Sequence, residues 1–232
     1  MGQPVSIAFV DSTSVRYLGF GPSLESGPSQ PSDFWDYLRS LGGEWMWDGV
    51  EEEGQDLQWL VDGLKGGTII AVTDGSCDRQ VAPTISGAGL VLCCTSARRM
   101  LRANFYEQSK SASLYRGELL GLVALHTLLL ALARFYDLGT IRPKICCDNI
   151  SALRQSSWRR RRVKTGASQA DVLRVIRTIR LDQLLKPTYE HVYGHQDRKK
   201  LWWNLPLEAQ LNCVCDGLAK AAVSRSLLLA LP

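Results

Sequence analysis

The sequence lacks the cysteine and histidine spacings that hold zinc or build a disulfide framework. No Cys-x-x-Cys pair occurs in its 232 residues, and the seven cysteines are an odd number. Two adjacent pairs, Cys93–Cys94 and Cys146–Cys147, lie inside apolar runs, where free thiols are commonly buried. The pattern predicts buried or half-buried free thiols in a reducing compartment, so we expect an intracellular protein of the cytoplasm or nucleus.

Targeting segments and membrane-spanning runs are also missing. The first ten residues have no basic stretch followed by a long apolar one, so we expect no secretory signal. The one membrane candidate, the charge-free apolar run Leu119–Ala133, falls short of the roughly 20 residues that cross a bilayer. We therefore expect no membrane partner and interpret this run as a central buried helix.

Apolar residues are plentiful, and charge is distributed unevenly along the chain. Hydrophobic residues make up 45% of the sequence, which excludes a wholly disordered or low-complexity chain. Residues 1–66 carry eleven acidic and three basic side chains, whereas residues 67–232 carry twelve acidic and twenty-four basic ones. The resulting net charges of −8 and +12 favour a polyanionic partner for the second region, with nucleic acid as the first candidate.

The same change of composition predicts two parts. Residues 1–66 form an acidic, Trp-rich N-terminal segment with a Gly/Pro/Ser-rich linker at 21–32. Helical spacing of apolar residues between 33 and 66 predicts two short amphipathic helices there. Such helices bury too little surface to be stable alone, so we expect them to pack on the second part, residues 67–232.

From residue 67 onward, strand and helix patterns alternate. The expected strands cover 68–73, 87–94, 101–107, 144–147 and 188–193. The expected helices cover 113–136, 150–157, 168–185 and 206–229. This order predicts an α/β fold, with a mixed five-stranded sheet flanked by helices and a small helical segment at the N-terminus.

Four acidic residues lie where a carboxylate is costly to bury. Asp74 and Asp148 follow apolar strands, Glu118 lies in the most apolar helix, and Asp216 lies midway along the last helix. Acids at the ends of adjacent strands face the crevice in which α/β proteins bind ligands. Clustered carboxylate oxygens suit Mg²⁺ or Mn²⁺ better than zinc.

Each acid also has a purely structural interpretation. Asp74 fits turn chemistry, and Glu118 fits a helix N-terminus. Asp148 fits a helix N-cap, and Asp216 fits an ion pair with Lys220 four residues later. One such explanation is easy to accept, but four coincidences on these elements are not, so the set favours a metal site.

The motifs around these acids resemble those of the ribonuclease H family, in the family's order. They are Thr73–Ser76, Gly87–Gly89, Tyr115–Leu122, Cys147–Asn149, Gly194–Asp197 and Leu211–Lys220. The resemblance covers about residues 68–226 and is greatest to the ribonuclease H domain that closes a retrotransposon polyprotein after its reverse transcriptase. Residues 1–66 resemble the tail that joins those two domains.

The resemblance implies a metal-dependent endoribonuclease that hydrolyses the RNA strand of RNA–DNA hybrids with two Mg²⁺ ions, or Mn²⁺ in their place. It implies a reverse-transcriptase domain as a further partner within a longer polyprotein. Its metal ligands would be Asp74, Glu118, Asp148 and Asp216, and His195 would assist proton transfer or product release. The expected substrate-binding residues are Gly75, Ser76, Asn149, Arg159, Arg160, Arg161 and Arg162, of which the arginines would contact phosphates.

Two departures from the family pattern stand out. Gly117 replaces the usual alanine, for which we expect only a small loss of helix stability. The stretch from His195 to Asp216 is longer than in compact cellular enzymes and carries Trp202 and Trp203.

Three alternatives stay open: a module that binds nucleic acid or protein without cleavage, a DNA-acting nuclease or transposase of the same architecture, and a fragment active only within a polyprotein.

Overall fold

The computed structural model describes residues 7–11, 14–17, 33–52, 56–158, 162–164 and 166–229. The linker predicted at 21–32 lies outside these residues. Two strands that the periodicity did not predict, β1 (Ile7–Asp11) and β2 (Ser14–Tyr17), pair with each other antiparallel. They form a two-stranded sheet separate from the main one.

The main sheet has six strands, so the prediction of five was one short. In spatial order they are β3 (Glu51–Glu52), β6 (Arg99–Gln108), β5 (Ile85–Cys94), β4 (Ile69–Ser76), β7 (Lys144–Cys147) and β8 (Thr188–His191). Each of the first four is antiparallel to its neighbour, and β4, β7 and β8 are parallel. The extra strand, β3, is two glutamates long, and so short an acidic stretch has no alternating apolar pattern to reveal it.

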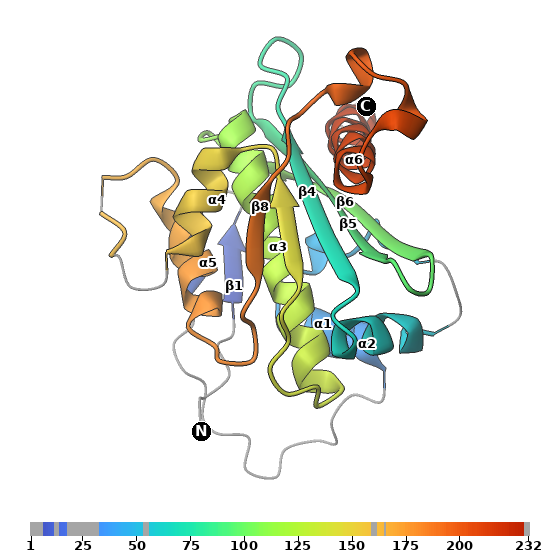
Figure 1. Ribbon diagram of the computed structural model, residues 1–232. Coiled ribbons are helices and arrows are strands. Elements are labelled where there is room, and N and C mark those ends of the chain that lie inside the picture. The colour runs from blue at the N-terminus through green and yellow to red at the C-terminus, as the bar shows by residue number, and fades with distance from the viewer. Residues whose placement is uncertain are drawn as a thin grey trace.

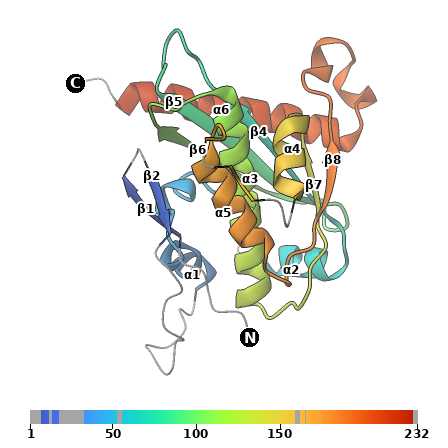
Figure 2. The ribbon, with the colours of Figure 1, turned by 90° about the vertical axis from the view of Figure 1, so that its left-hand side faces the viewer.

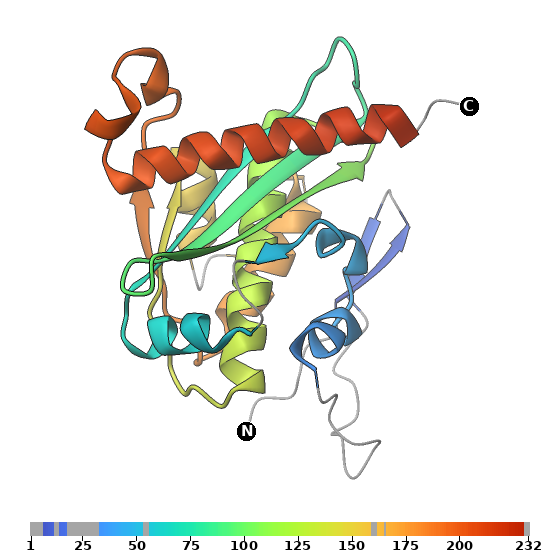
Figure 3. The same cartoon turned by 90° about the vertical axis from the view of Figure 1, so that its right-hand side faces the viewer.

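Helices cover both faces of this sheet. On one face lie α3 (Leu114–Phe135), α4 (Ile150–Ser157) and α5 (Ala170–Arg180), and α6 (Leu207–Leu229) crosses the other (Figures 1 and 3). The two faces hold separate hydrophobic clusters, with Leu90 and Leu92 in one and Val91 in the other. Because successive strand residues point to opposite faces, β5 is buried along its whole length.

Helix α3 is the central buried helix that the charge-free run predicted. Ser113 caps it, accepting a hydrogen bond from the Arg116 backbone nitrogen at 3.0 Å. At 22 residues the helix is longer than the charge-free run, and by length and composition alone it could cross a membrane. However, 89% of its most apolar window is buried inside the protein, where it contacts the sheet and α5.

The N-terminal helices, α1 (Phe34–Ser40) and α2 (Gln58–Lys65), pack on the same core. Phe34 meets Phe135 near the end of α3 with ring centroids 5.6 Å apart, and Trp45 meets Phe105 of β6 at 5.2 Å. Figure 2 shows α1 beside that end of α3. The segment 33–66 therefore shares a hydrophobic core with α3 and the main sheet, and the domain boundary at residue 66 stays a prediction.

The cysteines behave as the sequence predicted. All seven are free, five are buried, and only Cys77 and Cys213 are partly exposed. The adjacent pairs divide between environments because neighbouring strand residues face opposite ways. Thus Cys146 joins the cluster beneath α6, whereas Cys147 joins the cluster beneath α3.

Candidate active site

Asp74 lies near the end of β4, and Asp148 follows directly after β7. The parallel strands β4 and β7 pair with Val72 opposite Cys146, so the residues two positions farther on reach the same edge. The sequence suggested that a turn begins at Asp74, which is wrong. Strand β4 continues through Ser76, and Asp74 pairs with Gly89 of β5, so its carboxylate is held by a strand.

The Asp74 carboxylate is buried at 4% exposure among polar partners and like charges. It accepts hydrogen bonds from the Gly75 backbone nitrogen at 2.7 Å and from Asn212 Nδ2 at 3.4 Å. Burial, followed by the negative charges of Asp148 and Asp216, raises the pKa of Asp74 to about 7. Three of the four predicted acids therefore lie close enough to influence one another's ionisation.

Glu118 joins them from the second turn of α3, which approaches the sheet unusually closely. A Cβ on Gly75 would overlap the backbone nitrogen of Glu118, and one on Gly117 would lie 2.5 Å from the carbonyl oxygen of Gly87. The expectation that Gly117 matters only for helix propensity is thus wrong. In this chain, glycine at 117 is what lets the helix bring Glu118 against β4.

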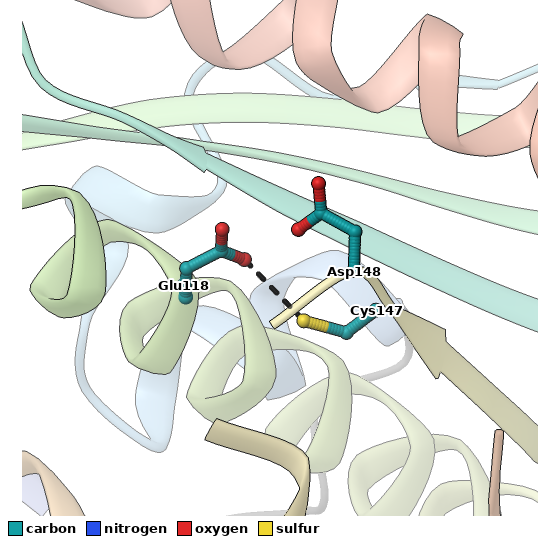
Figure 4. A group of neighbouring side chains, drawn as sticks. All are labelled: Glu118, Cys147 and Asp148. Atoms are coloured by element: carbon teal, nitrogen blue, oxygen red, sulfur yellow. Dashed lines mark hydrogen bonds between the residues drawn. The ribbon is translucent and has the colours of Figure 1, made fainter. Parts of the chain in front are cut away.

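Cys147 contacts Glu118 directly. Its Sγ donates a hydrogen bond to Glu118 Oε2 at 3.3 Å, and one ligand atom from each of Glu118, Cys147 and Asp148 lies within 4.8 Å of the others. Figure 4 shows the two carboxylates extending toward each other beside the sulfur. Burial, then the charges of Asp74 and Asp148, raises the pKa of Glu118 well above its ordinary value.

Asp148 is not a helix cap, although the sequence allowed that interpretation. The cap of α4 is Asn149, whose Oδ1 accepts from two backbone nitrogens of the first turn at 3.1 and 3.0 Å. The loop after β8 passes close by, since a Cβ on Gly194 would overlap Asp148 Oδ2. Asp148 therefore has no capping role and faces the other acids.

Asp216 has a lysine and a histidine as neighbours at the solvent side of the site. Lys220 Nζ lies 2.6 Å from its Oδ2, which is the i, i+4 pair that the sequence offered as a structural explanation. His195 Nδ1 lies 3.9 Å from the same oxygen. Asp216 also raises the pKa of Asp74. It therefore forms the ion pair with Lys220 and lies near the other acids at the same time.

The four carboxylates make a set of hard oxygen donors, and the ammonium of Lys220 pairs with one of them, Asp216. Two are buried, and each has a raised pKa because burial and the other acids disfavour its ionised form. A divalent cation that prefers oxygen ligands would remove that repulsion, so the residues fit the Mg²⁺ or Mn²⁺ that the sequence predicts. The sulfur of Cys147 is a softer donor beside Glu118 and Asp148.

The predicted substrate-binding residues are scattered. Gly75 is buried against α3, Ser76 lines a groove of about 700 Å³ beside α6, and the Asn149 side-chain oxygen is engaged in the cap. Arg159, Arg160 and Arg161 lie outside the described residues. Arg162 lines a second groove, of about 460 Å³, whose other polar walls include Tyr115, Ser151, Gln155, Lys164 and Arg177.

Sequence reasoning missed Arg116, which anchors the start of α3. Its guanidinium is 2% exposed, binds both carboxylate oxygens of Glu107, and lies 2.9 Å from Asp171 and 2.6 Å from Gln169 Oε1. These partners come from β6 and from the start of α5, so the arginine joins three elements two residues before Glu118. An arginine inside so apolar a helix was the signal that could have revealed it.

Comparison with solved structures decides which known fold this is. The solution structure of the ribonuclease H domain of prototype foamy virus superposes with a TM-score of 0.51, covering 68% of this chain and 95% of that one at 13% identity. The chain has the ribonuclease H fold. The protease–reverse transcriptase of the same virus superposes with a TM-score of 0.52, covering 68% of this chain and 21% of that longer one at 14% identity.

At these identities the likeness shows the ribonuclease H fold and nothing finer. Searches with the sequence itself found no matching family model and no matching curated protein. The predicted α/β fold and its ribonuclease H-like architecture are therefore confirmed, and the roles of individual site residues stay predictions.

Proposed function

We propose that this ribonuclease H-fold chain is an endoribonuclease that hydrolyses the RNA strand of RNA–DNA hybrids with divalent metal ions. The observation that supports the proposal most is the cluster of Glu118 and Asp148 with Asp74 beside them, and with Asp216 close enough to raise the pKa of Asp74. Two of these acids are buried and have raised pKa values. Burying carboxylates side by side costs folding free energy, and such groups are typical of functional sites.

Two Mg²⁺ ions, or Mn²⁺ in their place, are the proposed cofactors. Asp74 and Asp148 would flank both ions, and Glu118 and Asp216 would each hold one. When bound, such ions activate the attacking water and stabilise the leaving oxygen. The chain supplies the negative charge that holds them and, through Gly75 and Gly117, the close packing that keeps the carboxylates together.

His195 is the proposed proton-transfer residue. Its Nδ1 lies near Asp216 while its side chain is half exposed, so it can exchange protons with solvent beside the acids. The RNA strand would be recognised by minor-groove shape and 2′-hydroxyls rather than by base sequence. The arginines at 159–162 would contribute sequence-independent phosphate contacts.

The retroelement origin is a further part of the proposal. Support comes from the fold likeness to the ribonuclease H domain of a viral protease–reverse transcriptase. A reverse-transcriptase domain would then be a partner in a longer polyprotein, with segment 33–66 as its connecting tail. The free thiols support a location in the cytoplasm or nucleus.

The test is incubation of the full chain with end-labelled RNA–DNA hybrid, RNA duplex and DNA duplex, with and without Mg²⁺. We expect cleavage of the hybrid alone, within the RNA strand, and only with the metal. Cleavage of the DNA duplex would instead favour a DNA-acting nuclease or transposase. Binding of hybrid without cleavage under every metal condition would favour the non-cleaving module.

A matched pair of variants ties the activity to this site. Asp148→Asn removes a ligand charge without changing shape, so it should abolish cleavage while folding and hybrid binding persist. Asp62→Asn makes the same chemical change on the exposed face of α2 and should leave the rate unchanged. A wild-type rate in purified Asp148→Asn would show that the assigned site is wrong.

A further inference from the structure

The loop between β8 and α6 displays aromatic rings and cations to solvent. Tyr193 and Trp203 are each 74% exposed, and Trp202 is nearly half exposed. Between them lie three consecutive basic residues, Arg198–Lys200, all exposed. Large apolar side chains normally avoid water, so their gathering on one loop indicates a binding surface. We call residues 193–204 the aromatic–basic loop.

The loop has a defined conformation and is anchored to α6. It contains two short 3₁₀ turns, at Gln196–Arg198 and Trp202–Asn204. Gln210 of α6 donates from Nε2 to the carbonyl oxygens of Trp202 and Leu205 at 3.1 and 3.0 Å. Leu205 is itself buried in the cluster beneath α6. The rings are therefore exposed by an anchored loop, and they do not collapse onto the core.

The loop lies at the edge of the acidic cluster. It contains His195, whose Nδ1 is 3.9 Å from Asp216, and it begins directly after Val192, whose backbone nitrogen bonds the Cys147 carbonyl at 3.1 Å. Figure 3 shows it projecting at the N-terminal end of α6, beyond the ends of β7 and β8. A nucleic acid held at the acids would thus pass beside this loop.

The chemistry of the loop fits unpaired bases better than a duplex or a protein. Aromatic rings stack on bases that are free to leave their own stack, and cations bind the phosphates. Within a hybrid duplex the bases are already stacked, so exposed tryptophans find no such partner. Protein interfaces are depleted in lysine, yet Lys199 and Lys200 adjoin the rings, and Asp197 is the single acid in the loop's sequence.

We propose that the aromatic–basic loop binds a single-stranded nucleic acid segment that continues from the hybrid beyond the site of cleavage. Trp202 and Trp203 supply stacking surfaces, and Arg198–Lys200 supply phosphate contacts. The proposal rests on the proposed nuclease function only for the position of the hybrid. The binding of a free single strand does not depend on cleavage.

Binding is measured without metal, by fluorescence anisotropy of labelled single strands of about ten nucleotides and of hybrids with blunt or tailed ends. Tails of RNA and of DNA in separate arms show which strand the loop takes. We expect the Trp202→Ala/Trp203→Ala double variant to bind single strands and tailed hybrids at least about tenfold more weakly, since stacking contributes roughly 1–3 kcal/mol per base. Its affinity for blunt hybrid should stay near wild type.

Two controls separate stacking from other effects. Trp202→Phe/Trp203→Phe keeps aromatic rings and should restore most of the binding. Leu181→Ala removes a comparably exposed apolar side chain at the end of α5 and should leave the affinity for single strands and tailed hybrids unchanged. Circular dichroism and thermal melting establish that each variant is folded.

Four results would overturn the proposal. Unchanged single-strand affinity in the double Ala variant would mean that the rings do not bind bases. An equal loss for blunt and tailed hybrids would mean that the loop contacts duplex. A wild-type oligomer that the double Ala variant loses in size-exclusion chromatography, with single-strand binding intact, would assign the loop to a protein interface. Hybrid cleavage without single-strand binding would defeat this inference alone, and the reverse result would defeat the nuclease proposal alone.

Discussion

Cys147 donates its thiol hydrogen to Glu118 Oε2 across 3.3 Å, joining the end of β7 to the second turn of α3. Its neighbour Cys146 is equally buried but belongs to the cluster on the opposite face of the sheet. The thiol of Cys147 therefore faces the charged site, whereas the adjacent thiol of Cys146 faces an apolar layer. This difference makes them a natural matched pair for experiment.

Cys147→Ala should weaken Mg²⁺ binding by roughly tenfold, because groups that orient a metal ligand typically contribute that much. Cys147→Ser keeps a hydroxyl donor and should recover most of the affinity. Cys146→Ala removes the same atom on the apolar side and should leave Mg²⁺ affinity unchanged. Isothermal calorimetry on the three variants decides the matter, and equal affinities throughout would exclude an orienting role for the thiol.

The raised pKa of Asp74 predicts how the metal-free protein responds to pH. The folded protein holds this proton up to about pH 7, whereas the unfolded chain loses it near its ordinary value of 3.8. Protonated Asp74 therefore contributes to the free energy of unfolding fully below about pH 4, and this contribution is lost as pH rises through 7. The loss amounts to about 1.4 kcal/mol for each unit by which the two pKa values differ. Denaturant unfolding at several pH values in chelator should show it.

Buried His126 has the opposite effect and must be separated from Asp74. Burial lowers its pKa from 6.5 to about 4. The contribution of neutral His126 to the free energy of unfolding is therefore lost as pH falls from 6.5 toward 4. Comparing wild type with Asp74→Asn at each pH cancels the histidine. The difference between the two should shift in favour of Asp74→Asn as pH rises through 7, and Mg²⁺ should reverse it for wild type only. A pH-independent difference would contradict the raised pKa.

His195→Ala should slow steady-state hybrid cleavage by roughly the 10²–10⁴-fold typical of an acid–base group, or less if it only speeds product release. Magnesium affinity should stay near wild type, because Mg²⁺ prefers the carboxylate oxygens of the site to an imidazole nitrogen. Calorimetry beside the cleavage rate provides the measurement. Lost metal binding, or an unaltered rate, would remove His195 from this role.

Replacing Arg159–Arg162 with serine should weaken binding of every hybrid sequence alike. The slope of log K against log salt should flatten by up to about 0.9 for each phosphate that the protein no longer neutralises, if the value for B-DNA transfers roughly to hybrids. Arg142→Ser changes an exposed arginine in the loop before β7 and should leave the slope intact. An unchanged slope in the fourfold variant would assign these residues to a solvated surface.

A chain that begins at Gly66 should be less stable but should still cut hybrid. Removing the first 65 residues uncovers core residues such as Phe135, which packs on Phe34, yet Phe135 lies 17 residues along α3 from Glu118, or about 25 Å. Phe34→Ala in the full chain is the milder test and should cost about 3–5 kcal/mol of unfolding free energy. Lost cleavage in a folded sample of either protein would place the N-terminal segment in the active site.

Local patterns along the chain were enough to predict the elements and to identify the candidate acids. Alternating and helical apolar patterns located five of the six strands of the main sheet and its long helices, because these patterns record which side of an element faces the core. The same reasoning singled out Asp74, Glu118, Asp148 and Asp216, since charge on apolar elements is costly. It left open whether each acid served a turn, a cap, an ion pair or a common site.

The packing of the elements against one another resolved those alternatives. The register of β4 against β7 sets Asp74 beside Asp148, and Asn149 takes the cap that Asp148 could have filled. The contacts of Gly117 with Gly87 and of Cys147 with Glu118 join segments about 30 residues apart in the chain. A local pattern reports the burial of each residue but not the distance between two elements, and that distance is what brings carboxylates close enough to share a metal ion.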